Sequence, residues 1–194
     1  MPDYFLFFLL LIAALSHAIC HSILKYNKNP LGILGVTSIF EIIIFTPLVL
    51  TVPMPTPYIW ILIIVSSILH GFYRLLVIFS YDYGDLSFIY PIARGTSSLL
   101  LVIISLIYLT DKISLLGFIA IMIVCMGLFL ISYSDKIKFN YSAFGLGFLT
   151  AIMITAYTLV DGIGVRHSEN PFSFLYWMLL LNGTPALIAS FFFK

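Results

Sequence analysis

Long apolar runs separated by short polar breaks dominate the chain. Each run is about 21–24 residues long, and a helix of that length, rising about 1.5 Å per residue, spans a hydrocarbon core of about 30 Å. A transmembrane barrel would need alternating segments of about ten residues, and these runs do not alternate. The pattern predicts an all-α membrane protein with about seven transmembrane helices. The runs are Tyr4–Leu24, Leu31–Thr51, Tyr58–Ser80, Leu86–Leu109, Ile113–Tyr133, Ala143–Val165 and Pro171–Phe193.

Prolines, glycines and polar residues fill the breaks between the runs. Pro53, Pro55 and Pro57 make a stiff connection after the second run, and Asp111-Lys112 is a very tight link between the fourth and the fifth. Proline ends a helix because it lacks a backbone donor and its ring clashes with the preceding turn. Links this short predict that helices consecutive in the chain lie antiparallel and side by side in a compact bundle.

Two parts of the chain repeat the same order of features. An Asn-Pro pair opens the second run at Asn29-Pro30 and the seventh at Asn170-Pro171, and each of these runs carries a late proline. The implied period is about 138–141 residues, or five helices, as in the internal repeats of transporters. We therefore predict a five-helix repeat at residues 1–133, a linker at 134–142, and the first two helices of an inverted second repeat at 143–194.

Composition supports the membrane interpretation and argues against several functions. Hydrophobic residues make up 62% of the chain, charged residues 9%, and the mean hydropathy is +1.15, whereas soluble domains carry about 25% charged residues. The net charge of +1, without a basic stripe, leaves the lipid bilayer rather than nucleic acid as the partner. No glycine-rich phosphate loop, nucleophile elbow or paired-histidine zinc motif occurs, so we predict neither an enzyme nor a cofactor.

Charged residues inside the apolar runs are the candidate functional groups. A charge facing lipid costs about 2.5–3.5 kcal/mol on insertion scales, so such residues usually face a cavity or a partner. Arg94 is the strongest candidate, because it follows Tyr90 by four positions and Pro91 lies between them. Pro91 can break the start of the helix and leave polar backbone lining a cavity, where a guanidinium binds carboxylate or phosphate. The alternative is a structural ion pair between Arg94 and Glu41 or Asp161.

Two acidic residues, Glu41 and Asp161, lie in the second and sixth runs. Glu41 either hydrogen-bonds a neighbouring helix or forms part of a substrate or proton site. Asp161 follows Tyr157 by four positions, hence on the same helix face. Asp161 either pairs with Arg94 or Arg166 or binds an amine on a substrate, and Tyr157 belongs to the same candidate site.

Histidines occur twice with helical spacing to another polar residue. His70 and Arg74 are four apart in the third run, and Arg74 either snorkels to the helix end or lines a pathway with His70. His17 and His21 also share a helix face, a spacing that can chelate a metal. Because the sequence offers no convincing further ligands, we predict no metal site and keep His17 and His70 among the candidate substrate contacts.

Four stretches along the chain resemble the EamA family of the drug/metabolite transporter superfamily. They are Ser16–Ala18, Tyr81–Gly95, Asp111–Gly117 and Ala156–Arg166. The resemblance implies ten helices in two inverted five-helix repeats around a central cavity, and export of amino acids or other small metabolites across the plasma membrane. The chain departs from the family in lacking three closing helices, and its final Phe-Phe-Phe-Lys194 is what a longer protein would show if cut there.

The leading hypothesis is a secondary transporter, or a large fragment of one, for a small polar or zwitterionic metabolite. Arg94 and Tyr90 would contact the substrate, and Glu41 and Asp161 would bind it or carry the coupling proton. Rocking of one repeat against the other would give alternating access. The alternative is a non-transporting membrane subunit, which assembles through its incomplete second repeat with a second copy or with a partner that supplies the missing half.

Overall fold

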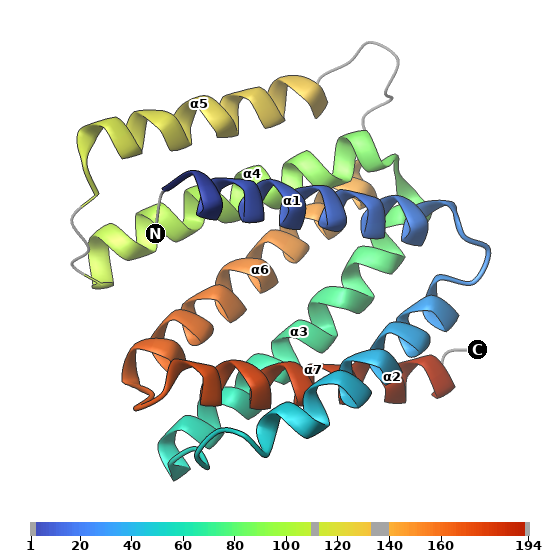
Figure 1. The fold of residues 1–194 in the computed structure, drawn as a ribbon. Coiled ribbons are helices and arrows are strands. Elements are labelled where there is room, and N and C mark those ends of the chain that lie inside the picture. The colour runs from blue at the N-terminus through green and yellow to red at the C-terminus, as the bar shows by residue number, and fades with distance from the viewer. Residues whose placement is uncertain (1–2, 110–112, 133–139, 193–194) are drawn as a thin grey trace.

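The computed structural model describes residues 3–109, 113–132 and 140–192, and within these residues the chain is helical and forms no strand (Figure 1). The helices found there are long and apolar enough to cross a membrane, and there are seven of them, which confirms the predicted all-α membrane class. They are α1 (Asp3–Tyr26), α2 (Pro30–Val49), α3 (Pro57–Tyr83), α4 (Leu86–Ile104), α5 (Leu115–Ser132), α6 (Tyr141–His167) and α7 (Pro171–Phe192), with a π-helical turn, η1 (Ser105–Leu109), after α4.

Asparagine side chains define where three of the helices begin. The Asn29 side-chain oxygen accepts a hydrogen bond from the Gly32 amide at 2.8 Å at the start of α2. Asn140 does the same for the Ser142 amide of α6 at 2.9 Å, and Asn170 for the amide of the second residue of α7 at 2.9 Å. Asparagine is a favoured N-cap because its oxygen satisfies an amide that has no partner within the helix.

The helices that pack together are mostly distant in the sequence. α2 packs along α7, α3 packs against both α6 and α7, and α4 lies between α5 and α6 (Figure 1). In the part of the chain that the structure describes, α4 and α5 are the only consecutive helices with extensive packing. The prediction that consecutive helices lie side by side was therefore wrong for the other helices, because a short link joins only helix ends and the fit between faces decides the rest.

Small residues bring α2 and α7 close together in a reciprocal way. A Cβ atom added at Gly35 of α2 would lie 2.6 Å from the Ser190 hydroxyl of α7. A Cβ atom added at Gly183 of α7 would lie 2.9 Å from the Ser38 carbonyl oxygen of α2. Each glycine thus faces a serine of the other helix, and the backbones approach as they do at small-residue interfaces in membranes.

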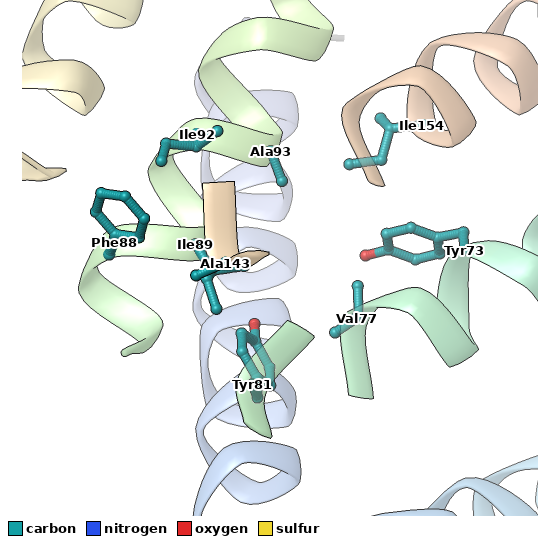
Figure 2. Close-up of a cluster of buried hydrophobic side chains, with 9 residues drawn as sticks. All are labelled: Tyr73, Val77, Tyr81, Phe88, Ile89, Ile92, Ala93, Ala143 and Ile154. Carbon is teal, nitrogen blue, oxygen red and sulfur yellow. The ribbon is translucent and has the colours of Figure 1, made fainter. Parts of the chain in front are cut away.

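The described side chains form three groups of buried apolar residues, and α3 contributes to each of them. The largest lies between α3, α4 and α6 and consists of Tyr73, Val77, Tyr81, Phe88, Ile89, Ile92, Ala93, Ala143 and Ile154 (Figure 2). A second group joins Ile59 and Ile63 of α3 to Phe174 and Met178 of α7. The third joins Ile78 of α3 to α2 and α7. α3 is therefore the central helix of the molecule.

Helix α1 lies on the outside of the bundle and contacts α2, α3 and α4 only slightly. His21, at 6% exposure, is the only buried side chain among the described side chains of α1. The apolar side chains of the first half of the helix are open on all sides, with Leu10 at 69% exposure. The attachment of α1 is therefore polar, through its second half.

Candidate functional site

Three polar side chains on one face of α1 attach it to α3 and α4. His17, His21 and Lys25 are four residues apart from one to the next, so they share a helix face. The Lys25 ammonium donates to the Tyr81 and Gly84 carbonyls at 2.5 and 2.8 Å, at the C-terminal end of α3. A cation is favoured there because the last carbonyls of a helix lack partners within it.

His21 and His17 connect α1 to Arg94 of α4. The Tyr81 hydroxyl lies 2.7 Å from His21 Nδ1, and His21 Nε2 lies 3.1 Å from His17 Nε2. Arg94 donates to His17 Nε2, and its guanidinium lies 5.9 Å from the centre of the Tyr90 ring. The His21 ring is 5.1 Å from the same Tyr90 ring. The structure therefore brings Arg94, Tyr90 and His17 together, as the candidate site requires.

The hydrogen bonds around His17 leave one donor too many. An arginine can only donate, so His17 Nε2 must accept from Arg94 with its single lone pair. The His17–His21 contact then also needs a donor, which must be the N–H at His21 Nε2. Both donors point at one lone pair, and only one of them can be well satisfied at a time. The cluster is therefore suited to a ligand that brings acceptor oxygens.

Arg94 does not form the ion pairs expected as its structural alternative. Both Glu41 oxygens are held by Arg74, at 2.7 and 3.0 Å, in a bidentate pair between α2 and α3. Asp161 contacts Ser66 and His70 instead. Arg94 therefore pairs with no carboxylate among the residues that the structure describes. The Arg74 guanidinium pairs with Glu41, a partner that neither of the two alternatives for Arg74 had named.

Pro91 does not break α4, in contrast to the expectation from the sequence. The helix begins at Leu86 and continues through Pro91 to Ile104. Proline at this position removes one backbone hydrogen bond and crowds the preceding turn, yet the helix continues through it. The irregular backbone lies at the other end, in the π-helical turn Ser105–Leu109. Arg94 therefore projects from a regular helix.

A second polar cluster lies between α3 and α6. The Ser66 hydroxyl donates to Asp161 Oδ1, and His70 Nε2 lies 3.8 Å from Asp161 Oδ2. His70 Nδ1 lies 3.0 Å from the Ser66 carbonyl oxygen and 3.2 Å from its hydroxyl. The Tyr157 ring stacks on the His70 ring with 3.9 Å between their centres. His70, Asp161 and Tyr157 therefore form one cluster.

Tyrosines connect the two clusters through the interior of the bundle. The Tyr73 hydroxyl lies 3.4 Å from His21 Nε2, and the Tyr73 and Tyr157 rings are 5.4 Å apart, edge to face. Tyr157 also lies close enough to Arg94 to interact with it electrostatically. A continuous row of polar and aromatic side chains thus runs along α3. Among the candidate residues from the sequence, Glu41 does not belong to this row, because both of its carboxylate oxygens accept hydrogen bonds from Arg74.

Several members of this row were missed in the sequence. Tyr81 is 6% exposed, and its hydroxyl bonds His21. Ser66, Tyr73 and Tyr81 were not considered as site residues. A signal was present, since Ser66, His70, Tyr73 and Tyr81 recur at helical spacing along α3.

Little space remains within the row in this conformation. A cavity of about 10 Å³ lies beside Arg94, lined by side chains that include His21, Tyr73, Tyr81, Tyr90 and Thr150. In Figure 2 the hydroxyls of Tyr73 and Tyr81 point in toward the centre of their cluster. Such a volume holds about one water molecule. A metabolite could reach Arg94 only after a movement of the surrounding helices.

Comparisons with known proteins return no relative. No known family model, no curated protein and no solved structure matches the chain. Among the described residues, no group of three or more His, Cys, Asp or Glu side chains could hold a metal ion. The helices establish a multi-pass membrane protein. Its family and activity must be argued from the arrangement of side chains.

Proposed function

We propose that the chain is a secondary transporter of the EamA type, exporting small polar or zwitterionic metabolites such as amino acids across the plasma membrane. The observation that carries this proposal is Arg94. It lies inside the membrane-spanning part of the bundle and pairs with no carboxylate of the described chain. Charged residues at such positions are rare and usually belong to substrate or ion pathways.

The surroundings of Arg94 suit a carboxylate ligand. A guanidinium binds a carboxylate through two parallel N–H donors, which gives both strength and orientation. Arg94 and His21 compete to donate to His17 Nε2. This competition would end if carboxylate oxygens of a ligand accepted the hydrogen bonds of Arg94. The Tyr90 ring lies 5.9 Å from the guanidinium, and aromatic faces also attract an ammonium group. Carboxylate and ammonium together describe an amino acid.

Access to the site would come from movement of α1 against the rest of the bundle. The cavity beside Arg94 has a volume of only about 10 Å³, so the described conformation is closed. α1 is attached mainly by the polar stripe His17, His21 and Lys25. Exchanging these few hydrogen bonds for contacts with a ligand requires little disruption of apolar packing. Such rocking of one part of a bundle about a fixed site is the general mechanism of secondary transporters.

Ligand-dependent thermal stability of the purified chain in detergent tests this proposal. The panel would contain zwitterionic, anionic and cationic amino acids, with neutral sugars for comparison. A ligand at about one hundred times its Kd stabilises the folded state by about 2.7 kcal/mol. We expect stabilisation by one amino-acid class in the native chain and in Arg166→Ala, an exposed-charge control, and none in Arg94→Ala. Saturable uptake of that ligand into proteoliposomes would then establish transport.

Two outcomes would contradict the substrate site. A metabolite that stabilises Arg94→Ala as much as the native chain would bind somewhere else. If no metabolite of the panel raises the thermal stability of a well-folded native sample, Arg94 no longer supports a substrate site. Arg94→Lys adds a further check, because a lysine keeps the charge and loses the bidentate geometry, so weaker binding is expected.

A second candidate function is a non-transporting subunit that assembles with a partner. The exposed apolar side chains in the first half of α1 favour this function, because an uncovered helix surface can contact either lipid or another protein. Cys20 is exposed on α1 and reports on this alternative directly. Efficient disulfide formation between the Cys20 residues of two copies, lost at high dilution in detergent, would favour assembly of two copies. A monomer that binds a metabolite would favour transport.

A further inference from the structure

The contact between His70 and Asp161 has two acceptors facing each other. Ser66 donates its hydroxyl proton to Asp161 Oδ1, so its oxygen is free to accept. His70 Nδ1 lies 3.0 Å from the Ser66 carbonyl oxygen and 3.2 Å from that hydroxyl oxygen, and both can only accept. His70 Nδ1 must therefore carry the hydrogen of the neutral imidazole. This leaves a lone pair on Nε2, which lies 3.8 Å from Asp161 Oδ2.

We propose that His70 and Asp161 together form a proton-binding site, which carries the coupling proton of the transporter. One proton taken up between Nε2 and Oδ2 converts two facing acceptors into a hydrogen-bonded pair. The charge of the pair changes from −1 to 0, and no other group needs to react. The site itself stands on this geometry, whereas its role in coupling rests on the proposed transport function.

Glu41, the other acidic candidate, is not equivalent. Both of its oxygens accept from Arg74 at 2.7 and 3.0 Å, so it has a permanent cationic partner. Asp161 has a hydroxyl and an imidazole as its partners instead. A carboxylate in a membrane interior that lacks a permanent cation is the more suitable group to take up and release a proton.

The other ionisable groups around the pair are accounted for by helix. On α3, Arg74 lies one turn from His70 and is paired with Glu41 of α2. On α6, Tyr157 stacks on His70, and Arg166 is exposed nearer the helix end. On α4, Arg94 interacts electrostatically with Tyr157, and on α3 the Tyr73 ring packs edge to face on the Tyr157 ring at 5.4 Å. Helix α7, which packs on α3, carries no charged residue and no histidine.

Tyr157 provides a route by which the proton could affect the substrate site. Its ring stacks on the His70 ring with 3.9 Å between their centres, and Tyr157 also interacts electrostatically with Arg94. A change of one unit of charge at the pair therefore acts on a side chain that also interacts with the substrate-binding guanidinium. Because the interior of a membrane protein has a low dielectric constant, the charge of the His70–Asp161 pair acts strongly on Tyr157 and on Arg94.

Infrared difference spectroscopy of the full chain in lipid vesicles, as a function of pH and without any metabolite, tests the proton site. We expect one carboxyl or imidazole transition that disappears in Asp161→Asn. The transition should survive in the double variant Glu41→Gln/Arg74→Gln, which removes the other acidic candidate of the membrane-spanning helices together with its partner. In Ser66→Ala, which keeps both titrating groups, the midpoint should move by about one pH unit through loss of the donor to Asp161.

Three results would overturn the proposal. These are a transition that persists in folded Asp161→Asn, one that disappears with Glu41, and one that sodium ions abolish at constant pH, which would make the site a sodium site. If Asp161→Asn does not fold, an unshifted midpoint in Ser66→Ala overturns the assignment by itself. Because no metabolite is present, the spectra are independent of the transport proposal. A chain that binds metabolite at Arg94 but shows no transition would refute only the proton site.

Discussion

The pair between Glu41 and Arg74 offers a quantitative test of the packing of α2 against α3. The two side chains form two hydrogen bonds at 2.7 and 3.0 Å and are 26% and 17% exposed, respectively. Breaking a fully buried pair costs about 3–5 kcal/mol, and a lone charge at the centre of a membrane helix costs about 2.5–3.5 kcal/mol. Because both side chains lie in membrane-spanning helices and are only partly covered by protein, the cost of a charge in the membrane, about 2.5–3.5 kcal/mol, is the closer guide.

The two single variants should not be equivalent. In Glu41→Gln the Arg74 guanidinium stays charged, since arginine is not deprotonated in proteins, and we expect a loss of about 2–3 kcal/mol in the free energy of unfolding. In Arg74→Gln the Glu41 carboxyl can take up a proton and become neutral, so the loss should be smaller, about 1–2 kcal/mol. The double variant should lose only about 1–2 kcal/mol, because no unpaired charge remains.

Reversible unfolding of the four proteins in mixed detergent and lipid micelles measures these differences. The coupling energy from the double-mutant cycle should be at least about 1 kcal/mol. Losses that add within about 0.5 kcal/mol would mean that the two residues do not interact in the membrane. A larger loss in Arg74→Gln than in Glu41→Gln would refute the reasoning about the stranded guanidinium, even if the coupling were confirmed.

Two further changes test the contacts of α7 and α1 in the same unfolding assay. Gly183→Ala should be less stable than Gly145→Ala by about 1–3 kcal/mol. The new Cβ at Gly183 would lie 2.9 Å from the Ser38 carbonyl oxygen, whereas a Cβ at Gly145 would have nothing within 4 Å. Equal stabilities would mean that α2 and α7 are not in close contact. His21→Phe should lose about 1–2 kcal/mol in the free energy of unfolding, because the Tyr81 hydroxyl and His17 would each lose a hydrogen-bond partner. A loss no larger than in the exposed control His167→Phe would contradict a polar attachment of α1.

The helices and their starts were predictable because they depend on local chemistry. Run length and hydropathy predicted every helix to within a few residues, since the thickness of a bilayer sets the number of apolar residues needed to cross it. The Asn-Pro pairs at Asn29 and Asn170 marked helix starts correctly, because an N-cap acts within its own first turn. The two-repeat organisation remains a prediction.

The pairing of the charged side chains was not predictable in the same way. Helical spacing shows which residues share a face, as for His70 and Arg74, but not which face of another helix they meet. The sequence offered Glu41 as a partner of Arg94, and the structure joins it to Arg74 instead. The sequence did predict Arg94 as a charge that needs explanation, because the cost of a charge in lipid does not depend on the neighbours.

The packing of α2 on α7 has a consequence for how the protein is made. Helices enter the membrane in order of synthesis, yet the main partner of α2 is separated from it by four intervening helices. During synthesis, the faces around Gly35 and Ser38 must remain against lipid or a chaperone until α7 has been inserted. Contacts between segments so distant in sequence form slowly. Assembly of the bundle therefore has a late step, and variants that weaken the α2–α7 contact should accumulate as inserted but incompletely folded chains, exposed to membrane proteases.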